Sequence, residues 1–396
     1  MPGLKKGLIM DTDTAAFKVR VLQKFGATQK DIDLLLDYVA NPMSLCALPS
    51  GLSLPLSDEP FAAVWKDYAQ KAGHEGFLQT LCSRLIQLNF PVQEGLSQDS
   101  GYQAAVKKGQ FPAEPGPGPL FSAPEQLKLF VHDSSAGSIG VLMAGNRQDF
   151  VTLVQALVYK NEPVPVPESL GAFMVSGYNN WERIKSYRRQ WMQGRKDSDD
   201  GLAWSLEFQN LKKKKHLYQD RFIILSNGFY SGIQPATLGL SPQERQEYSS
   251  RLRLEHECTH YFTFRVFSSM RKNIWDEILA DYMGILAARG SYSYKWFLLF
   301  LGLENYPAYR AGGRLEKYLP EYLTESAFGV LKSMTRAAAI NLQKLDQEFG
   351  QQFQSPQERS IMLLTLCVTG FCALASSDYR EFFLQNHSAV HRLQEQ

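Results

Sequence analysis

The feature that most constrains this chain is the pentapeptide His256-Glu257-Cys258-Thr259-His260. It lies in a stretch that begins with Ser241-Pro-Gln-Glu244, where serine, proline and glutamate have the order of a helix start. Residues four apart stack on one face of a helix, so both imidazoles can point to one metal ion. Glu257 is rotated by about 100° from His256 and therefore flanks such an ion without binding it. A fold of this chain must bring a further ligand to this helix.

A second predicted helix offers that ligand. A tetrahedral catalytic zinc ion has three protein ligands and one open position, and a single helix face cannot supply all three. Residues 274–284 form an amphipathic helical pattern in which Glu277 and Asp281 are four apart and share a face. We predict that Glu277 is the third ligand and that Asp281 accepts the second ring N–H of a ligating histidine. The alternative is a solvated acidic face, but the apolar residues around the two carboxylates predict burial.

The chain has few histidines, which makes their clustering informative. With seven histidines in 396 residues, a match to this motif is expected by chance on the order of 0.01 times. His387 and His391 are also four apart but lack the glutamate, so we expect only a frayed or surface helix there. Cys258 faces away from the predicted metal and is interpreted as a small core residue.

The composition restricts the partners. Lysine plus arginine (42) nearly balance aspartate plus glutamate (40), which leaves a formal net charge of +2. Such a balance gives no whole-molecule field to attract nucleic acid or an anionic membrane. The longest apolar run, Ile361 to Ala375, is shorter than the ~20 residues that cross a bilayer, so we expect a buried helix and no membrane partner.

Cysteine usage and the N-terminus indicate a compartment. The five cysteines have no CxxC spacing, which excludes a disulfide framework and a thiolate zinc ribbon. The first residues lack the apolar core of a secretory signal. We therefore predict a cytoplasmic protein, with leaderless export left open.

The pattern along the chain predicts an α+β fold in three regions. Residues 1–111 read as a helical N-terminal region, with helix starts at Thr28-Gln-Lys-Asp31 and Ser57-Asp-Glu-Pro60. A Pro/Gly-rich stretch then marks a boundary. Residues 120–270 are predicted to form a small mixed β-sheet subdomain that includes the motif helix, and residues 271–396 a mainly helical C-terminal subdomain that carries the third ligand.

The segments within the middle region follow the same patterns. Short β-rich runs lie at 127–132, 138–144, 172–176 and 221–225, and helical patterns lie near 149–159 and 181–191. The four lysines at 212–215 are expected in a solvated loop or at a strand edge.

The pairing of the motif with Glu-x-x-x-Asp on a second helix resembles the gluzincin group of zinc metallopeptidases, to which thermolysin belongs. The resemblance covers about 256–284. It implies that His256, His260 and Glu277 bind one zinc ion and that Glu257 is the general base and acid. It also implies that Asp281 supports a ligand. The chain departs from the group at Asp276, where an asparagine is frequent.

Two further parts of the site are implied by this resemblance. Gluzincins place an edge strand beside the zinc, where it pairs with the substrate backbone, and residues 221–230 match that segment, with Ser226, Asn227 and Gly228 as substrate contacts. An ordinary core strand is the alternative. Oxyanion stabilisation needs a donor after the third ligand, for which residues 306–314 offer candidates. These are Tyr306, Tyr309 and Arg310.

The resulting hypothesis is a zinc-dependent peptidase that acts on a peptide or protein substrate. Two alternatives remain: a non-catalytic zinc-binding scaffold with a peptidase-like fold, and a toxin or processing protease of narrow specificity. A fourth protein ligand would favour the scaffold. The cleaved bond, the choice between endopeptidase and exopeptidase action, the oligomeric state and the role of residues 1–111 stay open.

Overall fold

The computed structural model describes residues 14–49, 51–111, 116–193, 200–268 and 273–395. Its secondary structure is mixed, with many helices and one small sheet, so the predicted α+β class is confirmed. The chain forms two compact units. The first consists of Met1–Ser57, Ser134–Ala136 and Phe229–Gln396, and the second of Asp58–Asp133 and Gly137–Gly228.

This division differs from the predicted regions 1–111, 120–270 and 271–396. The N-terminal region is divided between the units, because its first two helices pack on C-terminal helices. For example, the Phe17 ring lies 5.1 Å from the Phe382 ring in an edge-to-face contact. The motif helix also belongs with the C-terminal helices, and not with the sheet. Part of the predicted Pro/Gly boundary, residues 112–115, lies outside the described residues.

The second unit contains the sheet, in the order β1-β2-β4-β3. Its strands are β1 (Lys128–Ser134), β2 (Gly137–Ala144), β3 (Ala172–Asn179) and β4 (Gln219–Ser226). β2 pairs with β4 in parallel, and β3 pairs with β4 antiparallel. The four predicted β-rich runs are confirmed. The predicted edge strand is wrong, however, because β4 has a partner on both sides and its residues 222–226 are buried.

Helices pack against this sheet. The helices of the unit are α3 (Ala62–Glu75), α4 (Phe77–Cys82), α5 (Ser100–Lys108), α6 (Arg147–Leu157), α7 (Trp181–Gln193) and α8 (Asp200–Lys213). Trp65 of α3 lies 4.7 Å from the Phe222 ring of β4, and α6 contacts β2 and β4. α3 begins at Ala62 without a side-chain cap, so the helix start predicted at Ser57 is wrong. The lysines 212–215 are exposed, but they lie at the end of α8 and in the short 3₁₀ turn after it.

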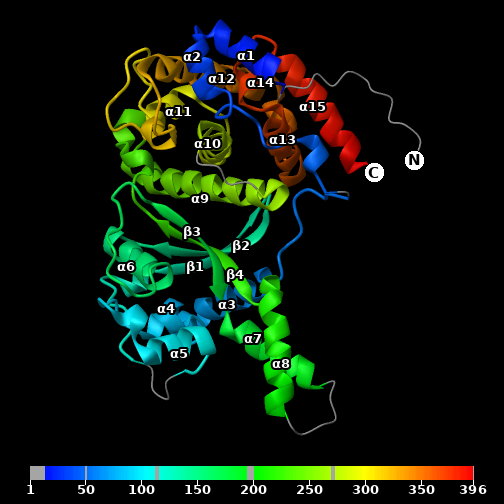
Figure 1. Cartoon of the computed structure of the whole chain (residues 1–396). Helices are drawn as coiled ribbons and strands as arrows, with labels where there is room; N and C mark the ends of the chain where they lie inside the picture. The colour runs from blue at the N-terminus through cyan, green and yellow to red at the C-terminus, as the bar shows by residue number, and fades with distance from the viewer. Residues whose placement is uncertain (1–13, 50, 112–115, 194–199, 269–272, 396) are drawn as a thin grey trace, which may run out of the picture. The chain divides into compact units, whose positions relative to one another are not determined.

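The first unit is helical. Its helices are α1 (Ala15–Lys24), α2 (Gln29–Leu35), α9 (Pro242–Phe267), α10 (Ile274–Arg289), α11 (Tyr294–Leu301), α12 (Glu325–Phe349), α13 (Pro356–Thr369), α14 (Phe371–Ala375) and α15 (Tyr379–Gln394). α9 begins with the predicted capping box of Ser241 and Glu244. α10 packs against α9, α11 and α13 (Figure 1) and is buried along most of its length.

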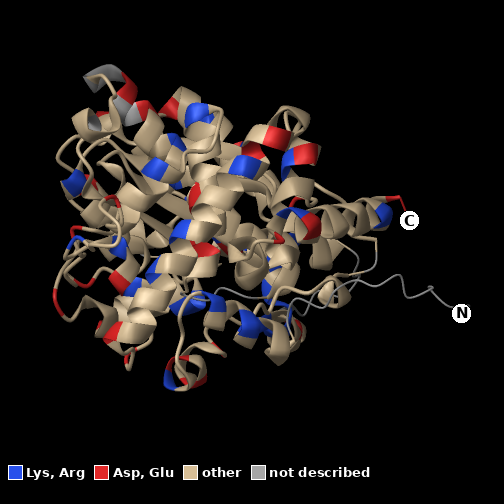
Figure 2. Cartoon of the chain, turned by 90° about the horizontal axis from the view of Figure 1, so that it is seen from above, with Lys and Arg blue, Asp and Glu red and all other residues tan. Residues whose placement is uncertain are grey.

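The apolar run at 361–375 forms parts of α13 and α14 and is buried, as predicted. No helix in the described part of the chain has both the length and the apolar character to cross a membrane. The ribbon in Figure 2 has Lys/Arg and Asp/Glu positions interspersed along the helices, in keeping with the small net charge.

α9 and α10 pack antiparallel in a register that places the candidate site. Glu277, Asp281 and Gly284 follow one face of α10 at helical spacing. Glu277 meets His260, Asp281 meets His256, and Gly284 meets Leu252 one turn further back along α9. A Cβ at Gly284 would lie 2.6 Å from the Leu252 carbonyl oxygen. The glycine therefore permits the close approach of the two helices.

Gly284→Ala is expected to destabilise the chain by about 1–3 kcal/mol, because the added methyl group has no space and forces the helices apart. The free energy of unfolding in urea measures this effect. Gly329→Ala in α12 is the matched control, since a Cβ there meets no atom within 4 Å. It is expected to stabilise the helix by about 0.5–1 kcal/mol. Equal effects of the two changes would contradict the close-packing argument.

Candidate metal centre

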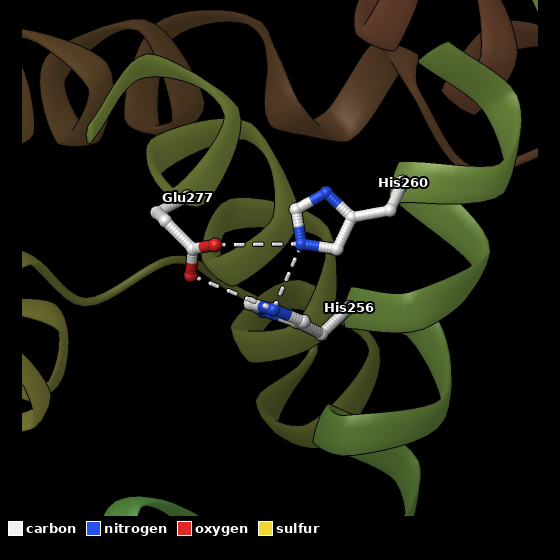
Figure 3. A group of neighbouring side chains, drawn as sticks. All are labelled: His256, His260 and Glu277. Carbon is white, nitrogen blue, oxygen red and sulfur yellow. Dashed lines mark hydrogen bonds and ion pairs between the residues drawn. The ribbon is translucent and has the colours of Figure 1, made fainter. Parts of the chain in front are cut away.

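Three side chains from α9 and α10 point toward one another (Figure 3). The Nε2 atoms of His256 and His260 are 3.1 Å apart. Glu277 places Oε2 3.6 Å from Nε2 of His256 and Oε1 3.5 Å from Nε2 of His260. Ligands that surround zinc tetrahedrally at ~2.0–2.2 Å are ~3.4 Å from one another. The separations therefore fit three ligands of one small ion.

Glu277 has the environment expected of a metal ligand. Its side chain is only 7% exposed, and Oε2 has no hydrogen-bond partner. Burial of a carboxylate is costly without a nearby positive charge. The Arg314 guanidinium, 3.6 Å from Oε2, supplies one, and a metal ion held by the two imidazoles would supply another. Among the described residues, His256, His260 and Glu277 form the group of three that could hold an ion.

Without a metal ion, the charges in this cluster favour an ionised Glu277 and a protonated His260. Burial alone would raise the pKa of Glu277, but the two imidazoles and the Arg314 guanidinium hold it well below its usual range. Burial alone would lower the pKa of His260, but the hydrogen bond to Glu277 and the nearby carboxylate charges raise it to about 9. A metal ion that binds here takes the place of that proton.

Asp281 lies behind the cluster, on the far side of the His256 ring. Its Oδ1 is 2.8 Å from His256 Nδ1, the ring nitrogen that faces away from His260. Tyr230, in the 3₁₀ turn η6 (Tyr230–Gly232), lies with its hydroxyl 2.9 Å from the same nitrogen. Arg314, at the start of η8 (Arg314–Tyr318), forms an ion pair with Asp281.

The sequence interpretation gave no role to Tyr230 and Arg314. Tyr230 is the last residue of 221–230, the segment predicted to pair with substrate. Arg314 is the last residue of 306–314, the segment predicted to supply an oxyanion donor. A buried arginine has no local sequence pattern that names its partner, so the sequence carried no signal for this contact. The partner becomes evident only when η8 and α10 are seen together.

Glu257 is half-buried on α9, beside the candidate ligand His256 in sequence. Its charge contributes to the raised pKa of His260, which places it in the electrostatic environment of the cluster. Cys258 is buried, as expected of a core residue, and burial raises the pKa of its thiol.

The three residues predicted to stabilise an oxyanion have other partners. Tyr306 shares a hydrogen bond of 2.8 Å with Ser333. Tyr309 donates to the Gly313 carbonyl at 2.6 Å. The Arg310 guanidinium pairs with Glu304 at 2.5 Å. A different tyrosine, Tyr318, follows this segment four residues later.

Tyr318 lies beside the third candidate ligand. Burial raises the pKa of its phenol, the Arg314 charge opposes this rise, and the negative charges of Glu277 and Asp281 add to it. The guanidinium carbon of Arg314 is 6.0 Å from the centre of the Tyr318 ring. Tyr318 is only partly buried. Tyr318 is therefore close to Arg314 and lies in the electrostatic field of Glu277.

The predicted substrate contacts belong to the second unit. Ser226 ends β4 and is buried. The Asn227 side chain donates to the Gly145 carbonyl, and the Gly228 N–H donates to Ser226 Oγ at 3.2 Å. Their role with a substrate stays a prediction.

The second histidine pair also has close ring nitrogens. The Nε2 atoms of His387 and His391 are 3.2 Å apart in α15. Neither histidine belongs to a group of three possible ligands among the described residues. The pair differs from the α9 cluster in lacking a carboxylate.

Comparison with known proteins places the chain in a family. A family model described as a family of unknown function, DUF7005, matches residues 20–378. The chain belongs to the DUF7005 family. The matched residues include both α9 and α10. No curated protein and no solved structure matches the chain.

Proposed function

We propose that this member of the DUF7005 family is a zinc-dependent metallopeptidase. The observation that carries the proposal is the convergence of the Nε2 atoms of His256 and His260 on the Glu277 carboxylate, with nearest separations of 3.1 to 3.6 Å. Two imidazoles and one carboxylate are a ligand set of catalytic zinc sites. The cluster comprises three residues within the described chain, the number of protein ligands in a catalytic zinc site whose fourth position is taken by water or substrate.

Glu257 carries the proton transfer in the proposed reaction. Zinc, when bound, acidifies a water molecule and polarises a carbonyl group. The Glu257 carboxylate accepts the proton of the attacking water while the water oxygen bonds to the peptide carbon. When the carbon–nitrogen bond breaks, Glu257 passes that proton to the leaving amine. Its partial exposure lets it reach water and substrate.

Tyr318 is the proposed donor to the developing oxyanion. Its ring is 6.0 Å from the guanidinium carbon of Arg314, and its phenol lies in the electrostatic field of Glu277. Tyr306, Tyr309 and Arg310 have partners elsewhere. A hydrogen bond aimed at the oxygen where charge develops stabilises the transition state more than the bound substrate.

Tyr318→Phe is expected to lower kcat by roughly 10²–10³-fold, the usual cost of one lost oxyanion donor. With zinc in excess, the zinc content is expected to stay at the wild-type value, because the three proposed ligand side chains are unchanged. Steady-state kinetics and metal analysis of the same sample measure both effects. Tyr322→Phe is the control, since Tyr322 is 82% exposed four residues later. A wild-type kcat for Tyr318→Phe would exclude this role.

The test of the proposed function combines metal analysis with peptide cleavage. The purified chain is analysed for zinc and incubated with a peptide library, and the products are identified by mass spectrometry. We expect bound zinc and new peptide termini that a chelator abolishes and added zinc restores. A chain that binds no zinc would contradict the proposal. Bound zinc without cleavage would favour the scaffold, and cleavage of one partner protein alone a narrow-specificity processing protease.

A further inference from the structure

We infer that Tyr230 and Arg314 are positioning residues that hold His256 through Asp281 in the ring orientation and tautomer required of a metal ligand. The inference rests on the proposed zinc site and extends it by two residues from separate parts of the chain. Neither residue belongs to the ligand group. Tyr230 contacts both His256 Nδ1 and the Asp281 carboxylate, and Arg314 contacts the Asp281 carboxylate.

The hydrogen bonds around Asp281 fix the position of one proton. A carboxylate oxygen only accepts hydrogen bonds. The 2.8 Å contact between Asp281 Oδ1 and His256 Nδ1 therefore places a proton on Nδ1. In the neutral ring, the lone pair then lies on Nε2, which faces His260 and Glu277. This is the tautomer that binds a metal ion through Nε2.

Tyr230 extends this arrangement. Its hydroxyl accepts a hydrogen bond of 2.6 Å from the Arg314 guanidinium. The single phenol proton is donated to Asp281 Oδ1, which is 2.5 Å away. The hydroxyl also lies 2.9 Å from His256 Nδ1. Since its proton is used on Asp281, the phenol does not compete for Nδ1 as a donor, and the His256 tautomer is retained.

Arg314 supplies a positive charge that pairs with the buried Asp281 carboxylate. The Asp281 side chain is fully buried, and the Arg314 side chain is only 13% exposed. One arm of the guanidinium pairs with Asp281 Oδ2 and the other with the Tyr230 hydroxyl. The same guanidinium lies 3.6 Å from Glu277 Oε2. Arg314 therefore contacts both the proposed ligand Glu277 and the carboxylate behind the proposed ligand His256.

The Tyr230 ring also has a packing contact that does not involve its hydroxyl. It packs edge-on against Phe300 of α11, with ring centres 5.0 Å apart. Removal of the hydroxyl alone keeps this packing, so Tyr230→Phe tests the hydrogen bonds and leaves the ring contact. Removal of a group that orients a ligating histidine typically lowers metal affinity by roughly 10–100-fold. We expect a loss of about this size when the Tyr230 hydroxyl is removed.

The experiment measures zinc affinity of the full chain by competition with a chromophoric chelator. Tyr230→Phe is expected to weaken zinc binding by roughly 10–100-fold. Tyr282→Phe is the matched control, because Tyr282 is also fully buried in this unit and donates to a buried carboxylate, Asp346, at 3.1 Å. It is expected to keep the wild-type affinity. The d–d absorption of bound cobalt, which reports ligand geometry, is expected to change only for Tyr230→Phe.

Arg314→Lys provides a second variant, since it keeps the positive charge but loses the two-armed contact. It is expected to weaken zinc binding in the same direction as Tyr230→Phe. Wild-type affinity in both variants would overturn the positioning role and leave the proposed zinc site standing. Equal losses in Tyr230→Phe and Tyr282→Phe would also overturn it, because the effect would then be general. A wild-type chain that binds no zinc would overturn both proposals.

Discussion

Glu257→Gln is expected to keep the bound zinc and to lower kcat for peptide hydrolysis by roughly 10²–10⁴-fold. The change preserves the size of the side chain but replaces a proton acceptor by an amide. Glu257 lies outside the three-residue ligand group, so zinc binding does not depend on it. The measurement is kcat and zinc content on the same preparation.

A glutamate elsewhere on the same helix provides the control for this variant. Glu247 is exposed on α9 and pairs with Arg251 at 2.6 Å, one turn later. Glu247→Gln is expected to retain wild-type kcat, since an exposed ion pair of this kind contributes little. Full activity of Glu257→Gln would exclude this residue as the general base. Loss of zinc from Glu257→Gln would instead assign Glu257 to the ligand set.

Local patterns in the sequence predicted local structure well. The helix starts at Thr28 and Ser241 depend on side chains that bond to backbone groups three residues away, and both capping boxes are present. The spacing of His256 and His260 follows from the helical repeat, and their ring nitrogens meet as expected from it. Each of these predictions depends on residues close together in the chain.

Features set by distant residues could not be predicted in the same way. Strand order is a property of the whole sheet. The apolar run at 221–225 is compatible with both an edge strand and an inner strand, so it does not predict the position of β4 in the sheet. The lysines at 212–215 are typical of a loop or a strand edge, but Lys212 and Lys213 are the last two residues of helix α8. Arg314 reaches Asp281 across 33 residues. Nothing in the sequence near Arg314 distinguished it from Arg310, which pairs on the surface instead.

His260→Ala is expected to abolish tight zinc binding, with a larger loss of affinity than the roughly 10–100-fold cost of an outer partner. It removes one of three ligand atoms, and two remaining ligands on different helices do not define a tetrahedral site. Zinc at about 100 times its Kd stabilises a folded chain by about 2.7 kcal/mol. We expect this zinc-dependent rise in unfolding free energy in the wild type and its absence in His260→Ala.

The histidine pair of α15 makes this expectation specific to the α9 cluster. His387→Ala also removes one histidine of a pair four residues apart. The Nε2 atoms of that pair are 3.2 Å apart, and those of His256 and His260 are 3.1 Å apart. It is expected to keep the zinc content and the zinc-dependent stabilisation, because no carboxylate completes that pair as Glu277 completes the other. Zinc retained by His260→Ala and lost from His387→Ala would place the metal in α15. It would also remove the basis for assigning chemistry to α9 and α10.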